Sequence, residues 1–270
     1  MEKLGIARHF GADSKRLHVN GLTVVHSSFH YFASCPWHYH QNAHFAFTTG
    51  GTLKETHRKF RLSLQAGALL YNHSDEPHCN SDYSDHVSAL HVDLEDSWFA
   101  AHGIDFSAWN GVHVINDPLV KVQFYRVFSE VRVNDTASPI AVETILLNCV
   151  AGMLGHRPAR PGGAPAWVEK VKSLLYDRYN ERILLREVAT EAGLHPVYLC
   201  QSFPAFFGCS FGEYVRKIRI EKAVDCLLRD SRGLTEIAYE CGFSDPSHFA
   251  RTFRKNVGVT PFDFRRGIRP

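Results

Sequence analysis

Residues 185–266 carry the same helical pattern twice, and this repeat constrains the fold more than any other feature of the chain. The matching positions in the first copy are Val188, Ala189, Gly193, Leu194, Pro196, Leu199, Phe203, Gly208, Ser210, Tyr214 and Arg216. Those in the second copy are Ile237, Ala238, Gly242, Phe243, Pro246, Phe249, Phe253, Gly258, Thr260, Phe264 and Arg266. An internal repeat of this detail indicates duplicated structural units. Each unit reads as a helix, a glycine turn and a second helix opened by proline, which predicts tandem helix-turn-helix motifs that bind DNA.

The second copy has the residues that a helix-turn-helix needs at each step. Gly242 follows an apolar helical stripe and permits the positive φ of the turn. Asp245 is placed to cap the next helix, and Pro246 occupies its first position, where no N–H is needed. Phe249 and Phe253 lie four residues apart and are expected to face the core.

The run from Gly242 to Arg265 resembles the C-terminal signature of the AraC/XylS-type transcription regulators. Its matching residues are Gly242, Phe243, Ser244, Asp245, Ser247, Phe249, Arg251, Phe253, Arg254, Gly258, Thr260, Pro261 and Arg265. The resemblance covers about a hundred residues, 167–266, and implies a seven-helix domain. A long central helix, at residues 210–228, would place the two recognition helices in successive major grooves of operator DNA. The family likeness also implies contact with RNA polymerase.

The resemblance carries the DNA-contacting positions onto both recognition helices. They are Val197, Cys200 and Gln201 in the first helix, and Ser247, His248, Ala250, Arg251, Arg254 and Lys255 in the second. Arg251 is the leading candidate for a base edge, because a guanidinium can bind guanine O6 and N7 together. Arg254 and Lys255 are expected to contact phosphates. One departure weakens the first helix: Pro204 stands where the family usually has Lys or Arg, and it predicts either a kink or an early helix end.

Charge and composition divide the chain into two domains. The 270 residues suit two domains of ordinary size. Residues 164–270 carry a net charge of +4, whereas residues 1–163 carry −2. The segment 157–165 is rich in proline and glycine and reads as a linker. We therefore predict an N-terminal effector-binding domain at 1–156 and a DNA-binding domain at 166–270, an α+β multidomain chain.

The cysteines and the hydropathy pattern favour a cytoplasmic protein with no membrane contact. Seven cysteines are odd in number and form no CxxC pair, which argues for reduced thiols. No charged-then-apolar leader opens the sequence, and no apolar run approaches the ~20 residues that span a bilayer.

The N-terminal half is rich in histidine and in short apolar segments. Fourteen of the 17 histidines lie before residue 114. Segments 22–30, 44–49, 68–72 and 87–94 are rich in Val, Phe, Leu and Tyr and are separated by turns. This pattern predicts a small antiparallel β-barrel.

The histidine spacing resembles the two motifs of a cupin barrel, over residues 36–82. The resemblance assigns a metal-binding role to His38, His40, His44 and His78, with His44 in place of the usual glutamate. Two histidines at i and i+2 on a strand project to the same face. A site made of neutral imidazoles suits Zn²⁺, Fe²⁺, Ni²⁺ or Cu²⁺.

Three readings of this histidine cluster stay open at the level of sequence. It holds a metal ion, it lines a metal-free pocket for an unknown small-molecule effector, or it forms no defined site. The residues expected to line either kind of pocket are Tyr39, Phe45, His73, Glu76 and Cys79.

Two further helices are expected at residues 118–133 and 139–154. The second is apolar over more than one face, which suits either a homodimer contact or packing within the subunit.

These patterns together predict a transcription regulator that is not an enzyme. A metal-dependent cupin enzyme with a DNA-binding tail is the main alternative. Its catalytic case is weak, because the histidines lack a clear acid or base carboxylate and the nearby candidates are Glu76 and Asp82. A protein-binding adaptor fails to explain the outward cations Arg251, Arg254 and Lys255.

Overall fold

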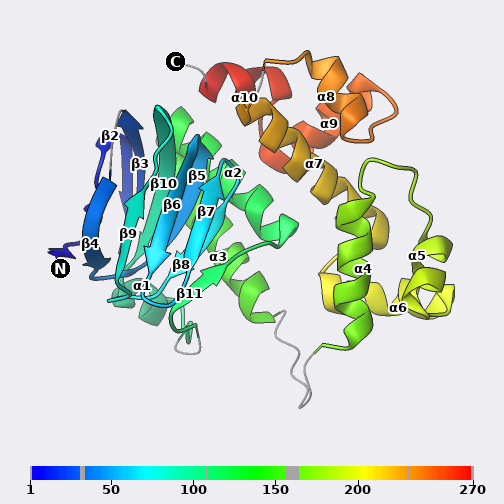
Figure 1. Cartoon of the computed structure of the whole chain (residues 1–270), viewed down its shortest axis with the longest axis horizontal. Coiled ribbons are helices and arrows are strands. Elements are labelled where there is room, and N and C mark those ends of the chain that lie inside the picture. Colours follow the sequence, from blue (N-terminus) through cyan, green and yellow to red (C-terminus); the bar gives the residue numbers. More distant parts are fainter. Residues whose placement is uncertain (1, 31–33, 107–108, 156–163, 230, 269–270) are drawn as a thin grey trace. The chain divides into compact units, whose positions relative to one another are not determined.

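The computed structural model describes residues 2–30, 34–106, 109–155, 164–229 and 231–268 (Figure 1). The chain divides into two compact units. Unit 1 contains residues 1–116 and 127–145, and unit 2 contains residues 117–126 and 146–270.

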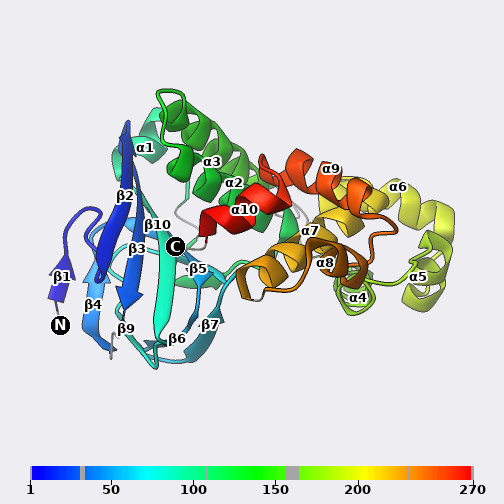
Figure 2. The ribbon, with the colours of Figure 1, turned by 90° about the horizontal axis from the view of Figure 1, so that it is seen from above.

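Unit 1 is built from two β-sheets and short helical segments. The five-stranded sheet has the order β1 (Glu2–Leu4), β4 (Ser34–His40), β9 (His78–Ser81), β6 (Thr52–His57) and β7 (Arg61–Gln65). The six-stranded sheet has the order β11 (Val112–Val114), β8 (Leu69–Asn72), β5 (Ala43–Gly50), β10 (His86–Leu94), β3 (Leu22–His30) and β2 (Ala12–Val19). Figure 2 shows β2, β3, β10 and β5 side by side in one layer. Three helices precede the linker region in the chain: α1 (Asp96–Ala101), α2 (Pro118–Val133) and α3 (Ser138–Gly155).

The four apolar segments predicted as strands are strands, but the described strands do not close into a barrel. Hydrogen bonding leaves β1 and β7 as the edges of one sheet, and β11 and β2 as the edges of the other. The expected cupin-like barrel is therefore not confirmed, and the described strands form two open sheets. The antiparallel pairing of β10 with both β3 and β5 makes β10 a central strand of the larger sheet.

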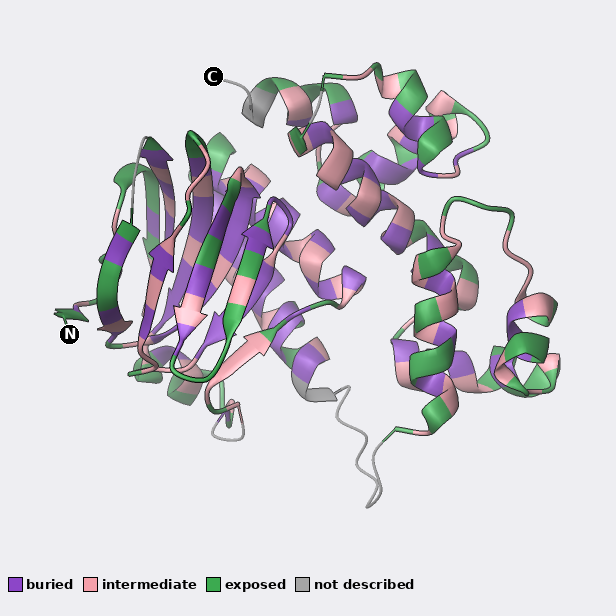
Figure 3. Cartoon of the chain, viewed as in Figure 1, coloured by how far each residue is buried: buried purple, intermediate pink, exposed green. Residues whose placement is uncertain are grey.

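Alternation along the strands gives the larger sheet two different faces. On β5, Phe45 and Phe47 are fully buried on one face, whereas His44, Ala46 and Thr48 point to the other face. The second half of α2 covers the Phe45 face through ring contacts such as Phe128 with His26, whose centroids lie 5.1 Å apart. Figure 3 shows that buried residues occupy strands of both sheets.

Unit 2 contains the helix-turn-helix region. Residues 164–229 and 231–268 form seven helices, as the family resemblance implied. They are α4 (Ala166–Asp177), α5 (Leu185–Ala192), α6 (Pro196–Phe207), α7 (Phe211–Arg229), α8 (Leu234–Glu240), α9 (Pro246–Val257) and α10 (Pro261–Ile268). The long central helix α7 begins and ends within one residue of the predicted range. The helices that we predict to be the recognition helices are α6 and α9.

The turns before α6 and α9 have the glycine geometry that the repeat predicted. Gly193 and Gly242 have φ values of 74° and 81°. A Cβ on Gly242 would lie 2.7 Å from backbone atoms of Asn180, whereas one on Gly193 would meet nothing within 4 Å. The second turn is therefore packed against the backbone that follows α4, and the first is open.

Pro204 does not end the first recognition helix. The helix α6 runs through Pro204 to Phe207, and the carbonyl of Pro204 accepts the N–H of Gly208 at 2.9 Å. Because proline has no N–H, the carbonyl of Cys200 lacks its usual helical donor. The predicted early helix end is wrong.

The predicted domain boundary falls close to residues outside the described ranges. Of the predicted linker 157–165, only Ala164 and Pro165 are described. Residues 117–126 and 146–155 belong to the predicted N-terminal domain but group with unit 2. None of the helices in the described ranges has the length and hydropathy that a bilayer crossing requires.

The helix α3 buries most of its apolar side chains within the chain. Ile145, Val150 and Met153 are buried, and Ile140 is 67% exposed. The exposed apolar surface that a homodimer contact would use is therefore small on this helix.

We predict that Gly242→Ala costs more stability than Gly193→Ala. An alanine at positive φ costs about 1–2 kcal/mol at either position. At Gly242 the added methyl group must also displace the backbone of Asn180, which should add about 1–3 kcal/mol. Urea denaturation followed by the helical circular dichroism signal would measure both variants. Equal losses would contradict the close packing of the second turn.

Candidate functional site

The helix α9 presents its predicted DNA-contacting residues to solvent. Ser247, Arg251, Arg254 and Lys255 are exposed on its outer side, and His248 and Ala250 are half-buried beside them. The opposite side of the helix is anchored by Phe249 and Phe253, both buried. Apolar anchors on one side and cations on the other are what a groove-reading helix requires.

Asp245 fixes the start of this helix. Its Oδ1 accepts the backbone N–H groups of Ser247 at 2.8 Å and His248 at 2.9 Å. These hydrogen bonds lower the pKa of Asp245, the bond from His248 having the larger effect. The predicted cap is confirmed, and it holds the first turn of α9 where a negative charge also complements the helix dipole.

The helix α6 offers a different surface. Val197, Cys200 and Gln201 are exposed as expected, and Val197 keeps 55% of its accessible surface. Its cap is weaker, since Nδ1 of His195 accepts the N–H of Val197 at 3.3 Å. The helix carries no lysine or arginine. Its exposed face is therefore neutral and largely apolar, in contrast to the cationic face of α9.

A second candidate site lies in unit 1, in a cavity of about 50 Å³ lined by residues of both sheets. One end of the cavity is apolar and includes Phe29, Leu64 and Val87. The polar lining consists largely of imidazoles, with one carboxylate, one amide, two hydroxyls and one thiol. These polar lining residues are His9, His38, His40, His44, His78, His91, Glu55, Asn80, Thr48, Tyr83 and Cys35.

Strand register brings these polar side chains together. In the smaller sheet, His78 of β9 pairs with His38 of β4 on one side and with His57 of β6 on the other. In the larger sheet, Asp93 of β10 lies opposite His44 of β5. Directly paired residues project from the same face of a sheet. Each sheet therefore supplies its own set of polar groups to the space between them.

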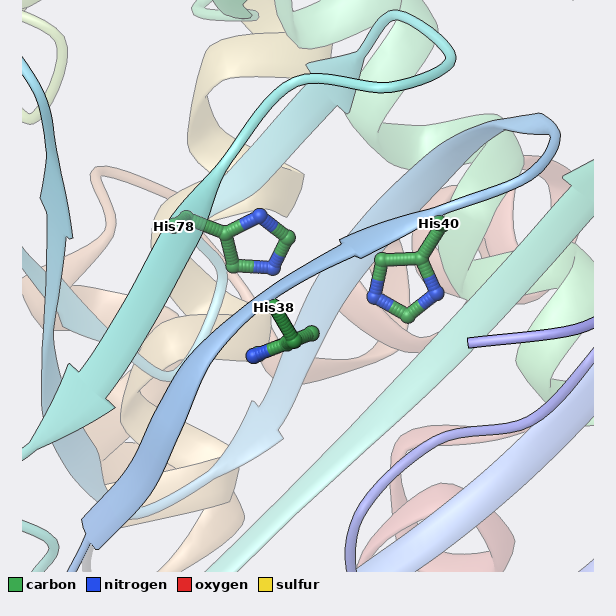
Figure 4. A group of neighbouring side chains, drawn as sticks. All are labelled: His38, His40 and His78. Atoms are coloured by element: carbon green, nitrogen blue, oxygen red, sulfur yellow. The ribbon is translucent and has the colours of Figure 1, made fainter. Parts of the chain in front are cut away.

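His38, His40 and His78 have the arrangement of a metal-binding triad (Figure 4). One nitrogen from each ring lies within 4.8 Å of the others, and all three residues are buried. Their ring centroids are 4.3, 5.2 and 5.4 Å apart. Metal–nitrogen distances near 2.0–2.1 Å would place tetrahedral imidazole centroids about 5 Å apart. The three imidazoles therefore fit one transition-metal ion.

His44, the fourth predicted ligand, lies beside this triad and not within it. Its ring is 4.3 Å from that of His40, and its Nε2 is 3.3 Å from Nδ2 of Asn72. Its Nδ1 is buried and has no hydrogen-bond partner among the described residues. The first-motif histidines His38 and His40 and the second-motif His78 thus lie together, while His44 contacts the neighbouring strand β8.

Burial keeps His38, His40 and His44 in the form that binds metal. Desolvation, followed by the nearby His78, lowers the pKa of His38 to about 4. Desolvation also lowers the pKa of His40 and of His44 well below the usual range. These rings are therefore neutral at physiological pH, and a neutral imidazole has a lone pair for a metal ion.

Glu55 is a cavity residue that the sequence did not single out. It is buried on β6, where Oε1 lies 2.9 Å from Nε2 of His57 and Oε2 accepts from Nδ2 of Asn80 at 3.0 Å. Burial alone would raise the pKa of Glu55, but the His57 hydrogen bond and the neighbouring groups lower it to about 2. A carboxylate thus orients His57 beside His78, at a centroid distance of 5.6 Å. The alternation of Glu55 and His57 along one strand is the signal that could have identified them.

The five residues predicted to line an effector pocket do not line this cavity. Tyr39 and Cys79 are direct sequence neighbours of triad histidines, and Phe45 is the neighbour of His44. Successive side chains on a strand point to opposite faces, so such neighbours face away from the cavity. His73 and Glu76 are half-buried in the segment between β8 and β9 and also lie outside the lining.

Comparison with known proteins finds relatives of the helical region. Residues 188–267 match a family model described as a helix-turn-helix domain. The chain is 37% identical over 86 residues to the Proteus vulgaris protein described as "Probable transcription factor PqrA", covering 32% of this chain and 70% of that protein. It is 29% identical over 127 residues to the Escherichia coli protein "Uncharacterized HTH-type transcriptional regulator YijO", covering 47% of this chain and 44% of that protein. The match thus spans less than half the length of YijO.

Among solved structures, an apo form of ToxT from Vibrio cholerae has 14% sequence identity and a TM-score of 0.41. That comparison covers 92% of this chain and 98% of the ToxT chain.

We predict that the chelator-treated protein loses stability steeply on acidification from pH 6.5. Burial lowers the pKa of His9 to about 3 and that of His26 to about 4, as it does for His38. The unfolded chain takes up these protons near pH 6.5, so folding stability is full above that pH and falls as the pH drops toward 4. Burial raises the pKa of Asp93 to about 7. The folded protein therefore binds one proton there as the pH falls, which offsets the stability lost through one histidine.

Two net protons from these four groups give about 3 kcal/mol per pH unit below pH 6.5, at about 1.4 kcal/mol per proton. The lowered pKa values of His40 and His44 steepen the loss further. Urea midpoints between pH 7 and pH 5 would measure it, and His26→Gln should make the slope shallower by about one proton. A flat profile would contradict the neutral, buried state of the imidazoles.

Proposed function

The chain belongs to the AraC/XylS family of transcription regulators, and we propose that it binds specific operator sequences under the control of a metal ion bound in the histidine cavity of unit 1. Unit 1 is the sensing part, in the place where we expected a cupin-like barrel. Unit 2 is the DNA-binding part.

The exposed face of α9 supports sequence-specific DNA binding. Arg251 is exposed on the same helix side as Ser247, more than one turn after the capped N-terminus. A guanidinium in that position can bind a guanine edge in the major groove. Arg254 and Lys255 lie in the last turn, where they can contact phosphates on the flank of the groove.

The size and donor set of the cavity support a metal ion over an organic effector. Its volume of about 50 Å³ has room for a few waters, at about 10–15 Å³ each. Pockets for drug-sized ligands are about 300–1,000 Å³. His38, His40 and His78 supply three nitrogen donors, which suit Zn²⁺, Fe²⁺, Ni²⁺ or Cu²⁺. A bound ion would join β4 to β9.

Control of DNA binding requires that the ion has different affinities for two states of the protein. An ion that binds both states equally shifts nothing. The proposed regulator therefore has at least two arrangements that differ in operator affinity, and the ion favours one of them.

The cupin-enzyme alternative receives less support from the positions of its carboxylates. Asp82 is at the surface, where it pairs with Lys54 at 2.6 Å, and Glu76 does not line the cavity. Glu55 does line it, but both of its oxygens are held by His57 and Asn80. None of these three carboxylates is therefore free to act as a general acid or base on a bound substrate. A homodimer, contact with RNA polymerase and a cytoplasmic location stay predictions.

Footprinting of the full-length protein on genomic DNA of its source organism tests this proposal. At fixed salt concentration, we expect discrete sites with two protected major-groove segments about ten base pairs apart. Removal of metal with EDTA should change their occupancy, and Zn²⁺ should restore it. Diffuse binding that is the same in all conditions would contradict the proposal.

Two variants test whether the footprint depends on α9. Arg251→Ala should relax base preference at one position by about 1–3 kcal/mol of discrimination. Lys255→Ala is the matched control, because loss of a phosphate contact should weaken all sites to a similar extent.

A further inference from the structure

We propose that the cavity holds a second divalent cation, bound by His9, His40 and Asp93 on the other side of His40 from the triad. This inference rests on the proposed metal-sensing function and extends it from one ion to two. Neither His9 nor Asp93 belongs to the histidine motifs that predicted the first site.

The three side chains converge from separate parts of unit 1. His9 lies in the segment between β1 and β2, His40 on β4 of the smaller sheet, and Asp93 on β10 of the larger sheet. One ligand atom from each lies within 4.8 Å of the others. The side chains of His9 and Asp93 are each only 2% exposed, and Nε2 of His9 lies 2.8 Å from Oδ2 of Asp93.

His40 has a nitrogen available for each ion. Its ring belongs both to the group with His38 and His78 and to the group with His9 and Asp93. Figure 4 shows one ring nitrogen of His40 toward His38 and His78 and the other directed away from them. Nδ1 of His40 is buried and has no hydrogen-bond partner among the described residues. A buried nitrogen without a partner is costly, and a second cation would supply that partner.

The chemistry of the second group suits a divalent cation. Two imidazoles and one carboxylate are a common donor set for Zn²⁺ and Fe²⁺. The cation would replace the proton shared by His9 and Asp93, and His40 would release its N–H proton to bind both ions; these protons leave to solvent. The positive charge would also compensate the buried carboxylate of Asp93.

The surroundings hold His9 in place for this role. Its ring stacks on that of His91, with centroids 3.8 Å apart and planes inclined by 15°. Both ring nitrogens of His91 are buried, and neither has a hydrogen-bond partner among the described residues. The ring of His9 is 4.9 Å from that of His40, which matches the spacing of about 5 Å expected for imidazoles on one ion.

The second ion would connect parts of the structure that the first does not. The triad joins β4 and β9, which are neighbours in one sheet. The second group joins β4 to β10 of the other sheet and to the segment that carries His9. Loading of both positions would therefore fix the two sheets and this segment to one another.

The test is the zinc stoichiometry of the full-length protein without an affinity tag. Metal is first removed with EDTA, and the protein is then equilibrated with buffered Zn²⁺ and measured by native mass spectrometry and elemental analysis. We expect two Zn²⁺ per chain. His9→Phe, Asp93→Asn and His78→Phe should each reduce this to one, and His40→Phe should reduce it to none. His86→Gln, which changes an exposed histidine outside the cavity, should retain two.

The outcomes separate this inference from the proposed function. One Zn²⁺ per chain, unchanged in His9→Phe and Asp93→Asn, would overturn the second site and leave the sensing triad. No bound Zn²⁺ would overturn both. The number of Zn²⁺ ions bound by the wild-type protein does not depend on any variant. Circular dichroism identifies variants that do not fold. Co²⁺ provides an independent readout, because two sites with different donor sets should give two absorption spectra that fill in separate steps.

Discussion

Desolvation of imidazoles between two sheets is the constraint on which the structure of unit 1 depends. A charged ring cannot be buried there without a partner, so His38, His40 and His44 are held neutral. A neutral ring has one donor and one acceptor nitrogen, and several of these nitrogens have no partner among the described residues. The fold thus carries an unfavourable polar interior that a metal ion would satisfy. Under the proposed function, an ion would shift the protein toward whichever state binds it more tightly.

The DNA-binding half shows that two copies of one motif need not be equivalent. The helix α9 has an aspartate cap with two short hydrogen bonds, a turn packed on Asn180 and cations in its last turn. The helix α6 has a histidine cap, an open turn and an internal proline. Each of these differences favours α9 over α6 as the main DNA-contacting helix. Sequence reading is expected to depend mainly on α9, with α6 adding shape and apolar contact.

The sequence predicted most of unit 2 and only part of the cavity, for a physical reason. Helix starts and turns depend on residues close in sequence, so Gly242, Asp245 and Pro246 identified them directly. His38 and His40 share a strand face by their spacing, and the second motif added His78. Strand register, however, is set by the whole sheet, and the fold as a whole brought Asp93 and His9 to the same cavity as His40. Tyr39 and Cys79, which are sequence neighbours of the histidines, do not line the cavity, because adjacent strand residues face opposite sides of the sheet.

We expect metal binding to unit 1 and DNA binding to unit 2 to be thermodynamically linked. Because linkage is reciprocal, it can be measured as an effect of DNA on the metal affinity. Isothermal titration calorimetry would compare the Zn²⁺ affinity of the free protein with that of its complex with a footprinted operator duplex. Linkage requires that DNA changes the Zn²⁺ affinity by the same factor as Zn²⁺ changes the operator affinity, typically about 5–150-fold. Such a matched change is the predicted result. Equal Zn²⁺ affinities with and without operator would contradict the account.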